Sequence, residues 1–157
     1  MAGTQINGIV READGTLWFP TMDGLFRLDH EGRPDQSLRR YGQAEGLADV
    51  RARAILRLRD GRMLVGTEGG LFELHGDRFL ASSEKTGLPH DIDITRIHQL
   101  PSGAIAVGTF SEQFYVFDGQ RWNRFGSEQG MPNNATFFMT EDDRGYLWMA
   151  GIRGIVR

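Results

Sequence analysis

Few residues of this chain are spaced for metal or acid–base chemistry. The four histidines, His30, His75, His90 and His98, never stand two or four positions apart, which is the spacing of two metal ligands on one face of a strand or helix. His90-Asp91-Ile92-Asp93 is the one sequence cluster of potential ligands. An imidazole and two carboxylates are too few to surround a hard cation without carbonyl donors. We therefore expect a solvated loop here and no metal site.

The sequence shows no nucleophile or phosphate loop in a catalytic setting. It contains no cysteine, which excludes disulfides, thiolate zinc sites and cysteine nucleophiles. None of its serines lies in a Gly-x-Ser-x-Gly turn, and no Gly-x-x-x-x-Gly-Lys loop is present. We therefore predict no catalytic residues and no cofactor.

The glycines instead mark an internal repeat. Gly15, Gly61, Gly103 and Gly145 each follow an apolar run, at spacings of 46, 42 and 42 residues. A second anchor recurs at spacings of 41 and 43 residues, as Gly46-Leu47, Gly87-Leu88-Pro89 and Gly130-Met131-Pro132. The longer first spacing coincides with the polar stretch 30–37, which we interpret as a loop insertion. Two independent anchors with one period predict a repeat of about 42 residues.

Each repeat has room for four short strands. Strand a precedes the turn glycine, strand b follows it, strand c is a Gly-Leu-Phe-type run, and strand d is a short aromatic segment. A period of 40–45 residues with four strands is typical of a β-propeller blade. We therefore predict an all-β fold in one domain, 1–157: a partial β-propeller of three full four-stranded antiparallel blades plus an incomplete fourth. The units are expected at about 6–50, 51–91, 92–135 and 136–157. A β-sandwich is the alternative, although it would not keep a 42-residue register.

In a propeller the b–c and d–a links lie on one face, and loops held by a scaffold are where binding residues concentrate. These positions also vary between the units, unlike the strand anchors. The candidate ligand-binding residues are Asp23, Glu68, Phe110, Glu112 and Arg153 in the b–c links, and Asp49, Arg51, His90, Asp91, Asn133 and Asn134 in the d–a links. Trp18 and Trp148 occupy equivalent b-strand positions, where we expect them in the core between blades.

Charge and hydropathy exclude two classes of partner. The net charge is −3, so no excess of basic residues is available to replace the counterions of a nucleic acid. No apolar run approaches the roughly 20 residues of a membrane span. The first residues show neither a basic segment nor an apolar segment of a signal peptide. We therefore expect no nucleic-acid partner and no membrane contact by this fragment.

The repeat resembles the two-component regulator propeller repeat, whose core reads Ile-x-x-Asp-x-x-Gly-x-Leu-Trp-x-Gly-Thr. Met63-Leu64-Val65-Gly66-Thr67 and Leu147-Trp148-Met149-Ala150-Gly151 carry this likeness, and Gly87-Leu88-Pro89 matches the closing Gly-Leu-Pro. The likeness runs from about Ile6 to Arg157. Pro20 and Glu112-Gln113 depart from the pattern at positions where it has glycine.

The resemblance implies a function and a location. Propellers of that family form the sensory region, outside the cytoplasm, of bacterial hybrid histidine kinases and diguanylate cyclases. The chain is therefore expected to be a non-enzymatic, periplasmic sensor fragment that binds an unknown small molecule or oligosaccharide. A downstream kinase or cyclase output is expected in the parent protein.

Two expectations remain open beside this one. The alternative function is a propeller enzyme, a lyase or hydrolase, whose candidates at the channel mouth are His90, Asp91, Asp93 and Glu112.

Closed propellers typically have 4–8 blades, so a partial propeller would expose an apolar blade face at each end. We therefore expect a head-to-tail homodimer that completes the propeller, with segment 1–5 along the partner's last strand. A four-bladed monomer that closes on itself is the rival.

Overall fold

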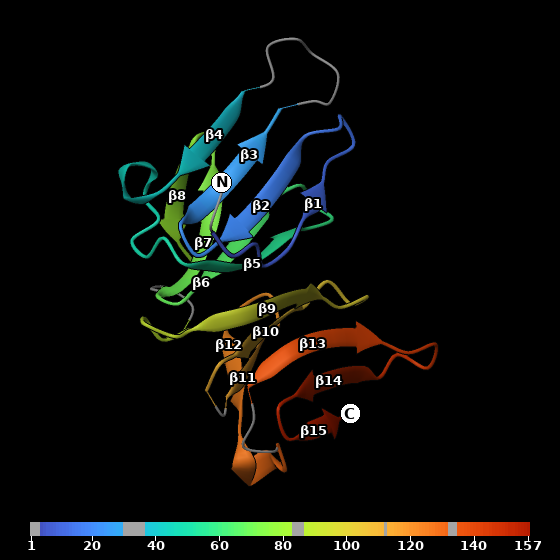
Figure 1. Cartoon of the computed structure of the whole chain (residues 1–157). Helices are drawn as coiled ribbons and strands as arrows, with labels where there is room; N and C mark the ends of the chain where they lie inside the picture. Colours follow the sequence, from blue (N-terminus) through green and yellow to red (C-terminus); the bar gives the residue numbers. More distant parts are fainter. Residues whose placement is uncertain (1–3, 30–36, 83–86, 112, 132–134) are drawn as a thin grey trace.

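The computed structural model describes residues 4–29, 37–82, 87–111, 113–131 and 135–157. These residues form fifteen strands in four antiparallel sheets (Figure 1). Blade 1 consists of β1 (Val10–Arg11), β2 (Leu17–Thr21), β3 (Gly24–Leu28) and β4 (Leu38–Tyr41). Blade 2 consists of β5 (Ala52–Arg57), β6 (Met63–Thr67), β7 (Gly70–His75) and β8 (Arg78–Ala81). Blade 3 consists of β9 (Ile94–Gln99), β10 (Ile105–Thr109), β11 (Phe114–Phe117) and β12 (Trp122–Phe125). Blade 4 consists of β13 (Thr136–Glu141), β14 (Leu147–Gly151) and β15 (Gly154–Val156).

The predicted fold class is confirmed. In every sheet each strand pairs with the next one along the chain, which is the meander of a propeller blade. Within the described ranges three sheets have four strands and the last has three. The helical content of the same ranges is two short 3-10 helices, Gln43–Glu45 and Ser127–Gln129, each directly after a strand d.

The predicted a–b turns are confirmed as well. Gly15, Gly61, Gly103 and Gly145 have φ angles of 87°, 90°, 91° and 79°, in the left-handed region that favours glycine. A side-chain oxygen accepts a hydrogen bond from a backbone N–H in each turn; in blade 1, for example, Asp14 Oδ1 accepts from Thr16 N at 2.9 Å.

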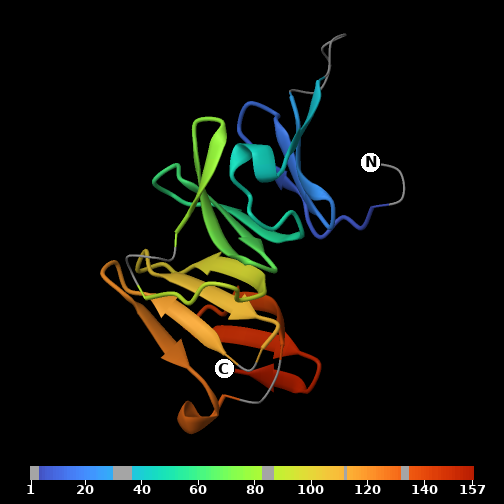
Figure 2. The same ribbon diagram turned by 90° about the vertical axis from the view of Figure 1, so that its left-hand side faces the viewer.

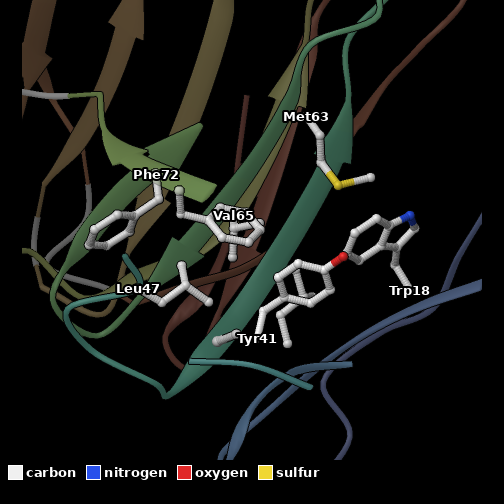
Figure 3. Packing of buried hydrophobic residues seen from close by; sticks show 9 residues of the cluster. Trp18, Tyr41, Leu47, Met63, Val65 and Phe72 are labelled. Carbon is white, nitrogen blue, oxygen red and sulfur yellow. The ribbon is translucent and has the colours of Figure 1, made fainter. Parts of the chain in front are cut away.

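The blades are joined by apolar contacts between consecutive sheets. Blades 1 and 2 lie together at one end of the molecule, and blades 3 and 4 lie at the other (Figures 1 and 2). Between blades 1 and 2, Trp18 and Tyr41 pack towards Met63, Val65 and Phe72, and all of them are buried (Figure 3). Equivalent clusters fill the spaces between blades 2 and 3 and between blades 3 and 4. The core is therefore a series of seams between blades.

The innermost strands of blades 2, 3 and 4 each have a bulge near their start. The pairing register shifts in β5, β9 and β13, so Arg53, Thr95 and Phe137 are each the extra residue, and Asn7 stands at the equivalent place in blade 1. Asn7 Nδ2 donates to Ala52 O of blade 2 at 2.7 Å. The hydroxyl of Thr95 donates to Thr136 O of blade 4. In blades 1 and 3 a polar side chain at this position thus donates a hydrogen bond to the next blade. The acceptor is the backbone carbonyl of the first residue of that blade's innermost strand.

The two end faces of the row of blades are apolar and exposed. Trp18 is 3% exposed against blade 2, as expected, but its equivalent Trp148 is 37% exposed, so the expectation that Trp148 lies in the core is wrong for this chain. The reason is positional: this face of blades 1–3 is covered by the blade that follows, and blade 4 is the last one described. Segment 1–5 lies outside the described residues except for Thr4 and Gln5. Gln5 O accepts a hydrogen bond from Met22 N at 3.2 Å, which places Gln5 along blade 1 of its own chain.

Candidate functional site

The predicted neighbourhood of b–c and d–a links exists in blades 2 and 3. In blade 2 the backbone N–H of Glu68 donates to Arg51 O at 3.2 Å. In blade 3 the N–H of Phe110 donates to Asp93 O at 2.8 Å. Each bond joins the residue after strand b to a residue before strand a. The two kinds of link therefore meet at one end of the blades.

An ion network runs across this end from blade 2 to blade 3. Arg51 Nη2 lies 2.7 Å from Asp49 Oδ2, and Nη1 of the same guanidinium contacts Glu68. Arg53 contacts the other carboxylate oxygen of Glu68, and its Nε lies 2.9 Å from Asp93 Oδ1. The chain of contacts is therefore Asp49–Arg51–Glu68–Arg53–Asp93. We call these five residues the ion network.

Arg53 is the residue that carries the network between blades. It occupies the bulge position at which Asn7 and Thr95 bond to the next blade, and it reaches Asp93, directly before the first residue of β9. The Arg53–Asp93 contact is an ion pair without hydrogen-bond alignment, because neither Nε nor Oδ1 has a partner in hydrogen-bond geometry. The Arg53 guanidinium also lies 5.6 Å from the ring centroid of Phe110, within the range of a cation–π contact.

Two carboxylates of the network, Asp49 and Asp93, have pKa shifts of opposite sign. The hydrogen bonds from Arg51 lower the pKa of Asp49, and those to Asp49 raise the pKa of Arg51, which is half exposed. Asp93 differs: burial raises its pKa, the charge of Arg53 opposes that rise, and the nearby charge of Glu68 adds to it. The charged form of Asp93, at the boundary between blades 2 and 3, is therefore disfavoured by burial.

Four of the predicted site residues are brought together here: Asp49, Arg51, Glu68 and Phe110. Asp23 lies in blade 1 and pairs instead with Arg40, whose Nη2 is 2.9 Å from Asp23 Oδ1. His90, Asp91 and Arg153 are exposed, and Asp91 has a left-handed backbone with φ of 58°. Glu112, Asn133 and Asn134 lie outside the described residues, so their placement stays a prediction.

The sequence pattern did not indicate Arg53 as a site residue, and it indicated Asp93 only as a member of the cluster 90–93 and of the enzyme alternative. Both precede or begin an innermost strand, and the repeat alignment assigned such positions to the scaffold. The available signal was the variation at the bulge position, which is Asn7, Arg53, Thr95 and Phe137 in the four blades. A charge at a position that is neutral in the other units indicates a role that the repeat does not require.

Two hollows lie near the seam between blades 2 and 3. One, of about 230 Å³, lies among the innermost strands and includes Asn7, Arg53, Ile55, Arg96 and Ile97 in its lining. The other, of about 370 Å³, lies at the opposite end of the seam. It is lined by Arg62, Leu64, Glu73, His75, Leu80, Ala81, Ser82, Ile105, Phe117 and Trp122. The ion network therefore borders the first hollow through Arg53.

This arrangement is suited to polar recognition. Guanidinium and carboxylate groups at a rim, beside an exposed ring, can donate to and accept from a polar ligand while the ring contacts its apolar face. Among the described residues no three His, Asp or Glu side chains are grouped as metal ligands. The described part of the chain has no helix of the length and hydropathy needed to cross a membrane.

No family model matches the sequence, and no curated protein matches it. Solved structures do match. The extracellular domain of the putative hybrid two-component system BT4673 from B. thetaiotaomicron superposes with a TM-score of 0.78 at 15% identity, covering 99% of this chain and 20% of that one. The corresponding domain of BT3049 from the same organism gives 0.69 at 16% identity, over 97% and 27%.

A virginiamycin B lyase from Staphylococcus aureus, determined with quinupristin, is also similar, with a TM-score of 0.71 at 13% identity over 97% of this chain and 50% of the lyase. The chain thus spans about a fifth to a quarter of the two extracellular domains and half of the lyase. At these identities the likeness concerns the fold. This chain shares its β-propeller blade architecture with these extracellular domains of putative two-component systems and with a lyase.

Proposed function

We propose that this chain is a non-enzymatic, ligand-binding part of a bacterial signal-transduction receptor, outside the cytoplasm, with a kinase or cyclase output in the parent protein. The ion network with Phe110 carries the proposal, because it gathers four predicted site residues on one end of the blades. The ligand is a small molecule or oligosaccharide that meets this surface.

The competing proposal, a lyase or hydrolase, has weaker support. Among its candidates, Asp93 is engaged with Arg53, His90 and Asp91 are exposed on the preceding link, and Glu112 lies outside the described residues. Catalysis by general acid and base needs two such groups within reach of one substrate.

A thermal-shift screen of the full chain against neutral and acidic oligosaccharides tests the proposal. At least one compound is expected to raise the Tm of the wild type and to lose this effect in Arg51→Ala and Phe110→Ala. Arg62→Ala is the matched control, because Arg62 also pairs with an aspartate two residues away, Asp60, at the opposite end of blade 2. A compound that is chemically converted, as seen by mass spectrometry, would establish the enzyme instead. Equal ligand-induced increases in Tm in all variants would show that the ion network is not part of the binding site.

We also propose that two copies assemble head to tail and complete a propeller. The face of blade 4 that is equivalent to buried seams exposes Trp148 and Ile155, whereas the matching Leu64 and Leu71 of blade 2 are 1% exposed. The opposite face of blade 1 exposes Ile6, Ile9 and Leu38, and Leu38 matches the buried Phe79 of blade 2. Both halves of an inter-blade seam are therefore present, one at each end of the chain's row of blades.

Light scattering tests this assembly. A two-copy propeller has about twice the 17.6 kDa of one chain. A mass of one chain at tens of micromolar would contradict it and would leave these faces to further blades of a longer protein.

A further inference from the structure

Arg96 lines the hollow of about 230 Å³ among the innermost strands, and it is half-buried there. It comes from β9, one residue beyond the bulge at Thr95. The other lining residues near it are the apolar Val10, Pro20, Ile55 and Ile97. A half-buried guanidinium thus lies beside an apolar wall of the hollow.

The charge of Arg96 is not matched by a carboxylate in the described part of the chain. Its polar contact is one hydrogen bond from Nη1 to Thr95 O at 2.7 Å, and its guanidinium lies 5.4 Å from the Phe138 ring centroid. A guanidinium has five N–H donors, so most of its capacity is unused by these contacts. Burial alone lowers the pKa of Arg96, with no contribution from a neighbouring acid. The side chain nevertheless remains a cation at any neutral pH.

Arg53, the other arginine that lines the hollow, differs from Arg96 because carboxylates compensate its charge. Arg53 is held between Glu68 and Asp93, so its charge is compensated within the ion network. The repeat does not require an arginine at the position of Arg96 either, because Ala54 and Phe138 stand there in blades 2 and 4. A charged residue that the blade does not need, in a hollow without a counter-ion, indicates a ligand of opposite charge.

We propose that this hollow binds the carboxylate of a small organic acid, with Arg96 as the group that recognises it. One uncompensated cation suits a singly charged group, and the planar fork of a guanidinium matches the two oxygens of a carboxylate. The volume is below the roughly 300–1,000 Å³ of pockets for drug-sized ligands, so the acid is about the size of a monosaccharide or smaller. The apolar wall contacts the part of the ligand that bears the carboxylate. The inference rests on the proposed ligand-binding role and names the chemistry of one contact.

NMR titration of the full chain tests the proposal. The probes are sodium glucuronate and sodium butyrate, two carriers of the same carboxylate, with glucose and inorganic phosphate for comparison. Saturable shifts are expected for Ile55, Ile97 and the Nε–H of Arg96 with at least one carboxylate, and weaker binding with glucose and phosphate. The carboxylate that binds more tightly distinguishes a sugar acid from an aliphatic acid.

Variants assign the effect to Arg96. Arg96→Gln should weaken carboxylate binding at least tenfold, the loss expected when a charged hydrogen-bonded contact is removed. Arg78→Gln, an exposed arginine on β8, should bind like the wild type. If Arg96→Gln fails to fold, Arg96→Lys provides the comparison, because it keeps the charge and loses the fork.

Unchanged binding in the Arg96 variant overturns the inference, as does equal binding of glucose and glucuronate or the absence of any carboxylate-dependent shift. A neutral oligosaccharide that depends on Arg51 while both carboxylates fail would overturn this inference alone and leave the sensor proposal standing.

Discussion

Gly66 of β6 lies directly against Ile94, the first residue of β9 in the next blade. A Cβ atom added to Gly66 would stand 2.5 Å from Ile94 Cγ2 and 3.2 Å from its carbonyl oxygen. Gly108 has the same relation to Thr136 of blade 4, at 2.6 Å from Thr136 Cβ. In blades 2 and 3 the Gly-Thr step therefore needs glycine, because the following blade lies too close for a side chain at this position.

Gly66→Ala should destabilise the protein by about 1–3 kcal/mol, the usual cost of inserting a methyl group into a packed core. Gly8→Ala is the control, because a Cβ there would meet Pro20 Cγ at an ordinary 3.6 Å. Urea denaturation gives both free energies of unfolding. A loss for Gly8→Ala as large as that for Gly66→Ala would contradict the close approach of the two blades.

The two equivalent tryptophans should differ in their contribution to stability. Trp18→Ala should cost about 3–5 kcal/mol, because the ring is buried between blades 1 and 2. Trp148→Ala should cost clearly less in dilute solution, because its ring is partly exposed although its Nε1 donates to Asp142 Oδ2 at 2.8 Å. Denaturant melts at sub-micromolar concentration measure both, and equal losses would show that the end face of blade 4 is covered within one chain.

Ile155→Glu should reduce the assembly to single chains, because it places a charge in the proposed seam between two copies. Leu80→Glu is the matched control: Leu80 is also exposed, at 55%, but lies on β8 away from both end faces. Light scattering distinguishes the two variants. Retention of the double mass by Ile155→Glu would exclude the blade 4 face from the interface.

The turn aspartate Asp118 should stabilise the protein only in its charged form. Backbone N–H groups of Arg121 and Gln120 and the Asn123 side chain donate to it and lower its pKa from 3.8 to about 2. Because the folded state holds the proton less tightly than the unfolded state, this stabilisation is complete above pH 3.8 and is lost as the pH falls towards 2. Asp118→Asn should therefore be less stable than the wild type at pH 7, by a margin that disappears near pH 2.

Denaturation of both proteins between pH 2 and pH 7 measures this margin. Asp143→Asn, at an exposed carboxylate in the a–b turn of blade 4, is the control for the loss of a turn charge. A constant difference between Asp118→Asn and the wild type would mean that the turn stabilises both charge states equally.

Local signals in the sequence were sufficient to predict the blades. Glycines that recur at one period, such as Gly61 and Gly103, specify the a–b hairpin turns. The apolar runs on either side of each glycine have the length of a strand and so predict strands a and b. These features act over a few residues, so they can be recognised without knowledge of the fold. The same periodicity also placed Asp49, Arg51 and Glu68 on one end of the blades.

The tertiary structure decided which side chains of different blades meet. Arg53 joins Glu68 to Asp93 because a bulge turns it towards the next blade, and Arg96 faces a hollow formed by three innermost strands. Trp18 and Trp148 have the same local sequence position, yet one is buried and the other exposed. Burial and ion pairing depend on distances across seams between segments about 42 residues apart, and a repeat pattern contains no information about those distances.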